Sequence, residues 1–173
     1  EDETTPTDKL VVYAGTGKFS SFGSRGSYNV GLYKSTDGGD TWELKAPLNL
    51  AGLNITAVVP TSNLDSGNQI VLVSALSKVG SDGTILRQGG IFRSTDAGEA
   101  FTRIVDGEAT DLVADPGDPN RFYAGVRGQG VLISTNGGAD WNPTTAQPIL
   151  AANGADENNT GGADDAGETA TGA

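Results

Sequence analysis

The sequence predicts an all-β protein made of three similar units. One eight-residue stretch occurs three times, at 35–42, 94–101 and 134–141. A short apolar run precedes each copy, and segments rich in Gly, Asn, Asp and Pro separate such runs along most of the chain. This alternation is typical of short β-strands joined by turns. Because an internal repeat determines the architecture of a chain, the other predicted elements are assigned to these three units.

The repeated stretch has the pattern Ser-x-(Asp/Asn)-x-Gly-x-x-(Trp/Phe), and we call its three copies the repeat turns. The Asp or Asn side chain can accept hydrogen bonds from the backbone N–H groups that follow it. The Gly can adopt a positive φ without steric cost, and the aromatic residue begins the next strand. Each copy therefore predicts a β-hairpin. The pattern positions are Ser35, Asp37, Gly39 and Trp42, then Ser94, Asp96, Gly98 and Phe101, then Ser134, Asn136, Gly138 and Trp141.

The first unit contains three predicted strands. Residues 10–15 are rich in β-branched and aromatic side chains, which favour a strand. A Gly- and Ser-rich loop follows at 17–29. The predicted strand 30–34 leads into the first repeat turn, the strand 41–45 leaves it, and 47–53 connects to the second unit. The first unit therefore lacks an obvious first strand.

The second unit contains four predicted strands, bounded by turn-forming residues. They are 55–60, 70–77, 90–93 and 100–105. The segment 62–68 predicts a turn-rich loop. The segment 78–88 is an insertion in which the Asp82-Gly83 step can turn a small hairpin.

The third unit also contains four predicted strands and is the most compact. They are 110–114, 122–126, 131–133 and a strand that begins at Trp141. The segment 115–120 contains two prolines and predicts a turn in which Asp115 and Asp118 cap backbone N–H groups. A short turn at 127–129 joins two of the strands.

The repeat turns resemble the Asp-box of β-propellers of the sialidase, xyloglucanase and sortilin type, and the segment 114–141 resembles one complete blade of such a propeller. The resemblance implies a β-propeller segment of about three four-stranded antiparallel blades, in which the Asp-box (BNR-repeat) hairpins are structural. The boxes begin at residues 35, 94 and 134. The second spacing, 40 residues, matches a four-strand blade of about 40–45 residues, and the first is lengthened by the segments 61–69 and 78–88.

The sequence divides into an acidic linker at 1–8, the three-blade segment at 9–150, and an acidic tail at 151–173 that is rich in Gly, Ala, Asn and Thr. The tail has no aromatic, Ile, Leu or Val residue, so we expect it to be disordered. Closed propellers typically have 4–8 blades. We therefore expect further blades, either from a longer chain or from another copy. The absence of Met, even at position 1, favours a fragment or a processed product.

The composition narrows the possible chemistry. The chain has no Cys and no His, which excludes disulfides, thiolate metal sites and imidazole bases, and we predict neither a metal nor a cofactor. The net charge of −11 lies mostly in the two ends, so we expect no basic face for nucleic acid. No apolar run approaches the roughly 18–20 residues of a membrane span. The family resemblance implies a secreted or extracytoplasmic protein.

In such a propeller, the loops between strands 2 and 3 share one face with the loops that join strand 4 to the next blade, and ligands usually bind there. We call this the loop face. The candidate ligand-binding residues on it are Lys18, Phe22, Arg25 and Tyr28 in the loop 17–29 and Arg87 in the loop 78–89. Aromatic side chains beside cations suit sugar stacking or protein binding. The alternatives are that an aromatic side chain of the first loop packs onto a neighbouring blade and that the second loop is a solvated hairpin.

Glycosidases need two carboxyl groups about 5–9.5 Å apart. Asp106 and Glu108 lie between the second and third units, on the loop face, and are the catalytic candidates. The alternative is an ordinary acidic turn. The Arg-Ile-Pro motif and the Tyr–Glu pair of sialidases are not recognisable. In xyloglucanase-type enzymes the catalytic carboxylates come from two separate propellers, so the resemblance implies that this chain holds one at most.

Three hypotheses on function remain. The first is a non-catalytic binding or scaffold module that recognises carbohydrate or protein through its loop face. The second is a fragment of a glycoside hydrolase, xyloglucanase- or sialidase-like, whose catalytic residues lie largely outside this chain. The third is an architectural spacer.

Overall fold

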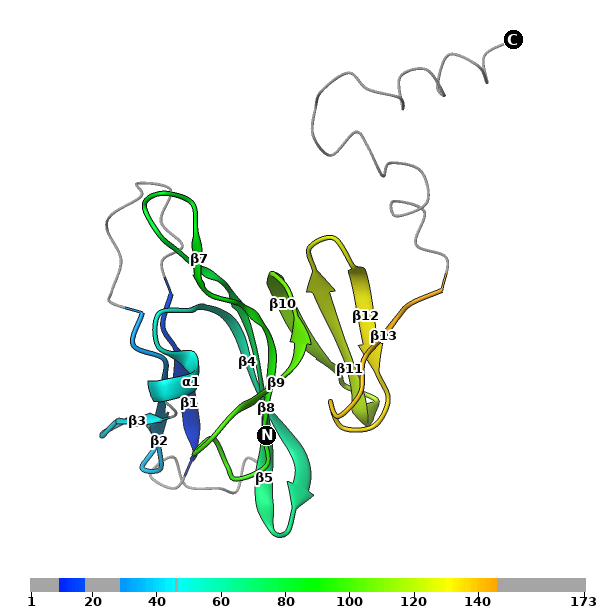
Figure 1. The fold of residues 1–173 in the computed structure, drawn as a ribbon. Helices are drawn as coiled ribbons and strands as arrows, with labels where there is room; N and C mark the ends of the chain where they lie inside the picture. Colours follow the sequence, from blue (N-terminus) through cyan, green and yellow to red (C-terminus); the bar gives the residue numbers. More distant parts are fainter. Residues whose placement is uncertain (1–9, 18–28, 46, 146–173) are drawn as a thin grey trace.

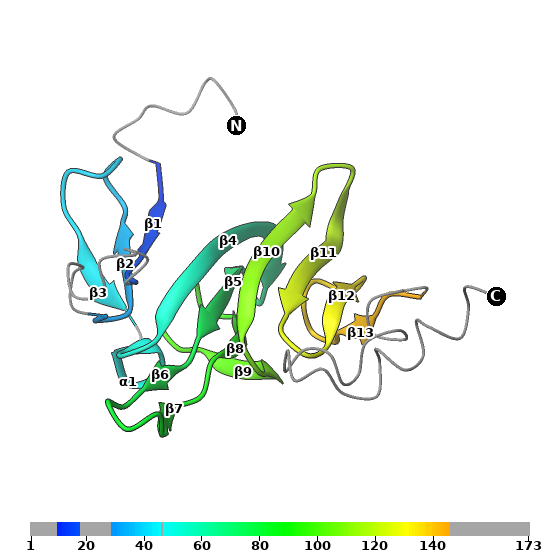
Figure 2. The ribbon, with the colours of Figure 1, turned by 90° about the horizontal axis from the view of Figure 1, so that it is seen from above.

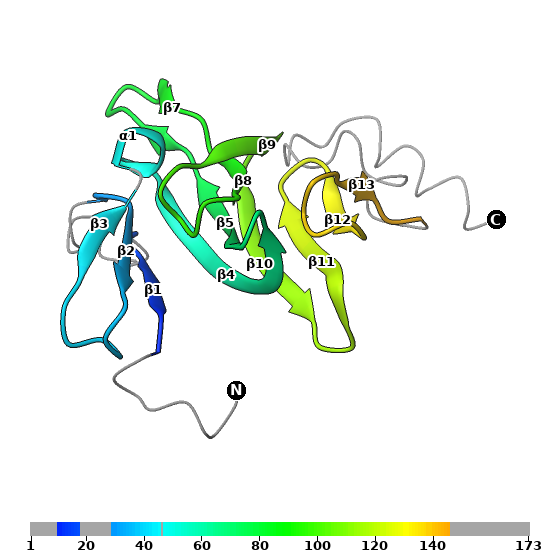
Figure 3. The same ribbon diagram turned by 90° about the horizontal axis from the view of Figure 1, so that it is seen from below.

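The computed structural model describes residues 10–17, 29–45 and 47–145 of the chain. These residues form three antiparallel β-sheets and a separate two-stranded hairpin (Figure 1). The views from above and below show the middle sheet lying between the other two (Figure 2, Figure 3). The expectations for residues 1–8, 18–28 and 151–173 concern residues outside this description.

Each predicted strand has a counterpart in the structure, and the all-β prediction is confirmed. The first sheet contains β1 (Val12–Gly15), β2 (Leu32–Ser35) and β3 (Glu43–Lys45), in that order. The single-turn helix α1 (Pro47–Leu50) leads to the middle sheet, which contains β4 (Asn54–Asp65), β5 (Asn68–Leu76), β8 (Gly90–Ser94) and β9 (Thr102–Asp106). The third sheet contains β10 (Ala109–Asp115), β11 (Asp118–Val126), β12 (Gly130–Ser134) and β13 (Asn142–Pro143). Among the described residues the first sheet lacks a fourth strand, as predicted.

The structure corrects the prediction of a loop at 62–68. Strand β4 continues to Asp65, which pairs with Asn68 of β5, so that Ser66 and Gly67 alone form the turn. Both residues have a positive φ, 50° and 86°, as a two-residue type I′ turn requires. The polar residues of this stretch therefore lie on an exposed hairpin, and the pairing shifts register between Pro60 and Leu64.

The small hairpin predicted within the segment 78–88 is confirmed. Strand β6 (Lys78–Val79) pairs with β7 (Ile85–Arg87). Gly83 has a φ of 82°, and Asp82 Oδ1 accepts a hydrogen bond from the Thr84 N–H at 3.1 Å. In Figure 1 this hairpin extends toward the top of the molecule, and the β4–β5 hairpin extends toward the bottom.

Two apolar clusters hold the sheets together. The first lies between the first and middle sheets and includes Leu32, Val71, Val73, Phe92 and Phe101. The second lies between the middle and third sheets and includes Ile70, Leu72, Ile91, Phe122 and Leu132. Successive residues of β5 enter different clusters because side chains alternate between the two faces of a strand. The middle sheet is therefore buried on both faces.

A cationic side chain also joins each sheet to the repeat turn of the next. Lys34 Nζ of β2 donates a hydrogen bond to Ala97 O at 2.9 Å. Arg93 Nε of β8 donates to Gly137 O at 3.2 Å. Ala97 and Gly137 occupy the same position of the repeat turn, one after its Asp or Asn, so the same contact occurs at both junctions between sheets.

Candidate functional site

Each repeat turn is closed by its own side chains. In the first turn, the Ser35 hydroxyl donates to Asp37 Oδ1 at 2.6 Å and accepts from the Gly39 N–H at 2.8 Å. Asp37 Oδ1 also accepts from the Thr41 N–H at 2.9 Å. The same three bonds occur at 2.6, 2.8 and 3.0 Å in the second turn and at 3.1, 3.0 and 3.0 Å in the third. The three serines are buried, and their hydroxyl groups form hydrogen bonds within their own turns.

The carboxylates of the repeat turns are strong hydrogen-bond acceptors. Hydrogen bonds from the side chains of Ser35 and Thr41 hold the pKa of Asp37 far below its usual range. Partial burial raises the pKa of Asp96, but hydrogen bonds from the Ala100 N–H and the Ser94 hydroxyl outweigh it, and the pKa is lowered. A carboxylate with a depressed pKa is a poor general acid at neutral pH. These two groups therefore suit a turn-closing role better than proton transfer.

The aromatic residues of the repeat turns differ in exposure. Phe101 is 3% exposed within the first cluster, and Trp141 packs against the second, so each is covered by the sheet that precedes it in the chain. Trp42 is 44% exposed. Its indole N–H donates to Gly39 O at 2.9 Å, which fixes the ring on the turn. Among the described residues no sheet precedes the first one, and this leaves Trp42 uncovered.

The β6–β7 hairpin is the most projecting described part of the loop face (Figure 1). Its side chains Val79, Ile85 and Leu86 are exposed. Arg87 is half-buried and lies opposite Lys78 in the strand register. The remaining predicted ligand-binding residues lie outside the described residues: Lys18, Phe22, Arg25 and Tyr28.

Asp106 and Glu108 both lie at the β9–β10 connection, but their carboxylates have different partners. Glu108 accepts hydrogen bonds from the Ser77 N–H, at 2.9 Å, and from the Ser77 hydroxyl. The Ser77 hydroxyl in turn accepts from the Gly89 N–H at 2.8 Å. Glu108 therefore fastens the two ends of the β6–β7 insertion. Asp106 is exposed and pairs with Arg103 Nε at 2.5 Å.

The predicted turn caps between β10 and β11 are confirmed. Asp115 Oδ1 accepts from the Gly117 N–H at 2.8 Å, and Asp118 Oδ1 accepts from the Asn120 N–H at 3.0 Å. The guanidinium of Arg121 lies 3.7 Å from each carboxylate. These two acidic residues serve the local turn.

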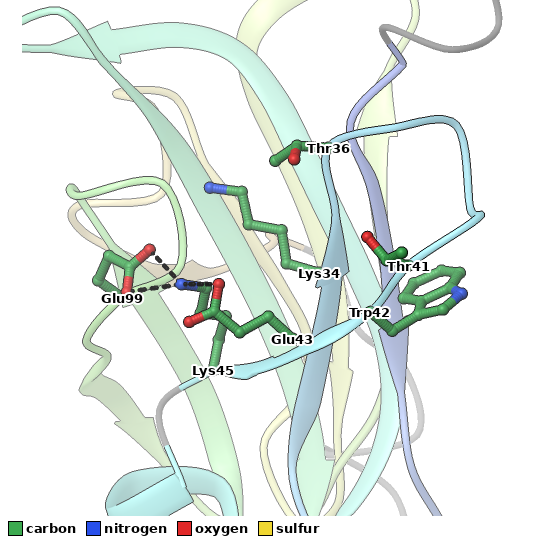
Figure 4. A pocket seen from close by; sticks show the side chains of 7 residues that line it. All are labelled: Lys34, Thr36, Thr41, Trp42, Glu43, Lys45 and Glu99. Atoms are coloured by element: carbon green, nitrogen blue, oxygen red, sulfur yellow. Dashed lines mark hydrogen bonds and ion pairs between the residues drawn. The ribbon is translucent and has the colours of Figure 1, made fainter.

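Sequence reasoning missed a polar pocket of about 250 Å³ on the first sheet (Figure 4). The buried Lys45 ammonium contacts Glu43 at 2.9 Å and Glu99 at 2.8 Å. Hydrogen bonds to Glu99 and then to Glu43 raise the pKa of Lys45. The Trp42 ring points away from this cluster. Because Lys45 and Glu99 are 54 positions apart, no local sequence pattern could have paired them. The other lining residues are Lys34, Thr36 and Thr41.

In the part of the chain that the structure describes, no group of three or more Asp, Glu, His or Cys side chains is placed to hold a metal ion. Within the same part, no helix is both long and apolar enough to cross a membrane.

Comparison with known proteins identifies the fold. The crystal structure of a GH74 xyloglucanase from Xanthomonas campestris matches 83% of this chain and 20% of its own length, with 22% sequence identity and a TM-score of 0.55. That of a GH74 enzyme from Niastella koreensis matches 76% of this chain and 19% of its own, with 22% identity and a TM-score of 0.49. This chain thus spans about a fifth of the length of either structure. No protein-family model and no curated protein sequence matches it. The three sheets are a segment of a β-propeller.

Proposed function

We propose that this chain is a non-catalytic β-propeller binding module whose loop face recognises a partner. The observation that carries the proposal is the β6–β7 hairpin. An insertion that exceeds what the sheet needs usually has a functional role. Val79 and Ile85 pair across the hairpin, and all three of its aliphatic side chains, including Leu86, are exposed. The cations Lys78 and Arg87 form the neighbouring pair. Aliphatic side chains bordered by cations suit a protein surface, because a sugar ring stacks best on aromatic rings.

The acidic residues of the loop face support a non-catalytic role. Glu108 is occupied by Ser77, and Asp106 pairs with Arg103. Asp82 accepts from the N–H of Thr84 inside its own turn. A glycosidase instead needs two carboxyl groups directed at one bond.

Several finer assignments belong to the same proposal. The repeat turns are Asp-boxes with a structural role, and the three blades occupy residues 9–150 between an acidic linker at 1–8 and an acidic tail at 151–173. Carbohydrate could bind the loop 17–29 through Lys18, Phe22, Arg25 and Tyr28, as the sequence predicts. The protein would act in a secreted or extracytoplasmic setting, with no nucleic acid partner.

A second candidate function is a fragment of a glycoside hydrolase. The fold similarity to a protein described as a xyloglucanase favours it. In this case Asp106, which is exposed, is the stronger candidate for a single contributed carboxylate, because both Glu108 oxygens accept hydrogen bonds from Ser77.

A cross-linking experiment tests the primary proposal. A photo-reactive benzophenone side chain replaces Leu86, and a matched control replaces Leu64, which is similarly exposed on the β4–β5 hairpin at the opposite end. We expect one defined protein to be cross-linked from position 86 in extracts of the source cells or their medium, and not from position 64. Cross-linking to the same proteins from both positions, or from neither, would contradict recognition through this hairpin.

Two further assays separate the carbohydrate and enzyme alternatives. On a glycan array, binding that is lost in Phe22→Ala, Arg25→Ala and Tyr28→Ala would assign a sugar site to the loop 17–29. Hydrolysis of xyloglucan that is lost in Asp106→Asn and retained in Asp82→Asn would support the glycoside hydrolase alternative instead. The primary proposal expects no hydrolysis from the unmodified chain.

A further inference from the structure

The described molecule ends in two uncovered apolar sheet faces. We call the first the front face. It belongs to the first sheet and consists of Val12, Ala14, Tyr33, Trp42 and Leu44. Tyr33 pairs with both Ala14 and Leu44, so these three side chains form one row across the sheet. Their neighbours Tyr13 and Leu32 point the other way, into the first cluster.

The second uncovered face, the rear face, belongs to the third sheet. It consists of Val113, Tyr123, Val131 and Ile133. Tyr123 pairs with both Val113 and Ile133, which again gives one row across three strands. Val113 is 49% exposed and Val131 46% exposed. The adjacent row, which contains Leu132, points into the second cluster.

The front face repeats the positions that are buried in the other two sheets. In strand register, Tyr33 corresponds to Phe92 of the middle sheet, because each lies two residues before the serine of its repeat turn. Trp42 corresponds in the same way to Phe101. Phe92 and Phe101 pack against the preceding sheet, within the first cluster. The front face therefore has the chemistry of a surface that a preceding sheet covers.

The rear face likewise corresponds to the side of the middle sheet that packs onto the third sheet. Leu72 pairs with Arg93, and Tyr123 pairs with Ile133. Arg93 and Ile133 each lie one residue before the serine of their repeat turn, so Tyr123 corresponds to Leu72. Leu72 packs onto the third sheet within the second cluster. The third sheet thus offers a following sheet the same kind of surface that the middle sheet offers to it.

We propose that the front face of one copy of this chain packs onto the rear face of a second copy, head to tail. The two surfaces are the two halves of the junction that the molecule already forms twice within itself. Contacts between unlike faces give either rings or open filaments. Two copies together have six of the described sheets, a number within the 4–8 blades of closed propellers, so we expect a ring of two copies rather than an open filament.

The junction between copies lacks one contact that both internal junctions share. Lys34 and Arg93 each donate to the next repeat turn, but the corresponding residue of the third sheet is Ile133. The junction between copies is therefore apolar and lacks the charged hydrogen bond. We expect it to be weaker than the internal junctions, so that the dimer dissociates on dilution.

The test measures the mass of the full chain by analytical ultracentrifugation from about 1 µM to about 1 mM, the range in which weak and moderate dimers dissociate. The chain alone has a mass of 17.6 kDa, and we expect twice that mass at high concentration. Leu44→Lys alters only the front face and Val113→Lys only the rear face. Leu64→Lys, on the exposed β4–β5 hairpin, is the matched control. Circular dichroism and thermal melting establish that each variant folds.

Mixing the two face variants separates this proposal from other dimers. Each variant alone has one defective partner surface at every junction and should remain monomeric. An equimolar mixture of Leu44→Lys and Val113→Lys keeps one intact junction and should recover a dimer, while Leu64→Lys should dimerise like the unmodified chain. A symmetric contact between like faces would not be rescued by mixing. A monomer at all concentrations, or a dimer indifferent to both substitutions, would overturn the proposal and leave sheets from outside this chain as the cover.

Discussion

A single buried hydroxyl organises each repeat turn. Ser94 is almost inaccessible, and its oxygen accepts from the N–H groups of Asp96, at 3.3 Å, and Gly98, at 2.8 Å, while it donates to the Asp96 carboxylate. Two backbone donors therefore depend on one side-chain atom, away from water that could replace it.

Removing this hydroxyl should destabilise the folded protein. We expect Ser94→Ala to lower the free energy of unfolding by about 1–3 kcal/mol, because the buried N–H of Gly98 loses its acceptor. Urea denaturation measures the change. Thr95→Ala is the control, since Thr95 is exposed and should change stability by less than about 0.5 kcal/mol. Equal effects of the two substitutions would show that the hydroxyl is dispensable.

The acidic members of the repeat turns make stability depend on pH. The pKa values of Asp37 and Asp96 are lowered in the folded protein. A depressed folded pKa contributes stability that is complete above the unfolded value, about 3.9, and is lost as the pH falls toward the folded value. In the third turn the uncharged Asn136 accepts the corresponding hydrogen bonds. Asn in place of Asp37 and Asp96 should therefore remove the contribution of these turns to the pH dependence of stability.

The corresponding experiment compares thermal melting between pH 7 and about pH 2. We expect the melting temperature of the unmodified chain to fall below about pH 4 and that of the double variant Asp37→Asn, Asp96→Asn to fall less steeply. Asp65→Asn, in the exposed β4–β5 hairpin, serves as a control for the loss of one charge. A double variant with an unchanged pH profile would indicate that other carboxylates govern acid unfolding.

Among single residues, those of the repeat turns were the most predictable from sequence. Asp37 and Asp96 accept from backbone N–H groups that follow them, as the pattern predicts. The partner of Glu108 was not predictable, since Ser77 lies 31 positions away and is brought near only by the packing of the middle and third sheets. Short-range hydrogen bonds can be read from spacing, whereas long-range ones depend on tertiary packing.

At the scale of elements, the second repeat turn contains a strained residue. Ala97 has a φ of 59°, and the other two turns have glycine at this position, Gly38 and Gly137. A residue with a β-carbon pays roughly 1–2 kcal/mol in the left-handed region, whereas glycine does not. The second repeat turn therefore contains backbone strain that the first and third turns avoid.

Replacing this alanine should relax the turn. We expect Ala97→Gly to raise the free energy of unfolding by about 0.5–1 kcal/mol, the strain relieved less the entropy that glycine gains in the unfolded chain. Ala100→Gly, three residues later with no positive φ, should instead lower it. Chemical denaturation of both variants gives the sign of each effect, and a loss of stability in Ala97→Gly would refute the strain argument.

Elements with alternating or apolar patterns were predicted well, and polar ones were not. The strands that enter the clusters, such as β5 and β8, match their predicted ranges closely because burial imposes the pattern. The outer half of β4 was predicted as a loop, since its residues from Ser62 to Asp65 are mostly polar. Pairing with β5 extends that strand into solvent, and polar composition alone does not exclude an exposed hairpin.

At the scale of the whole molecule, the described sheets form a linear array in which each outer sheet shares one apolar cluster with the middle sheet. The middle sheet contributes to both apolar clusters, and the outer sheets contribute to one each. Stability in such a linear array is approximately a sum of units and nearest-neighbour junctions. The middle sheet should therefore open last.

Hydrogen exchange measures this order. In dilute solution we expect the amides of Val71 to Val73 in β5 to exchange at least about tenfold more slowly than those of β1 and β13, which open with the outer sheets. Uniform protection across the three sheets would show instead that the molecule opens as one cooperative unit.

More of the fold than of the candidate site could be predicted from the sequence. The repeat turns implied the number of units because their hydrogen bonds are local, and the apolar runs between them implied sheets of three or four strands. The cluster of Lys45, Glu43 and Glu99 was not predicted, since it forms only when two sheets meet. Arg87 lies on the predicted hairpin, but no pattern indicated the exposed aliphatic residues beside it.

The junctions between sheets also bear on synthesis. A chain emerges from the ribosome N-terminus first. Leu32 of the first sheet is covered by Val71, Phe92 and Phe101, which are translated later. Until those residues emerge, the face of the nascent first sheet that carries Leu32 is uncovered. Translation that pauses or terminates before β5 would therefore leave this apolar face exposed to water, which favours aggregation.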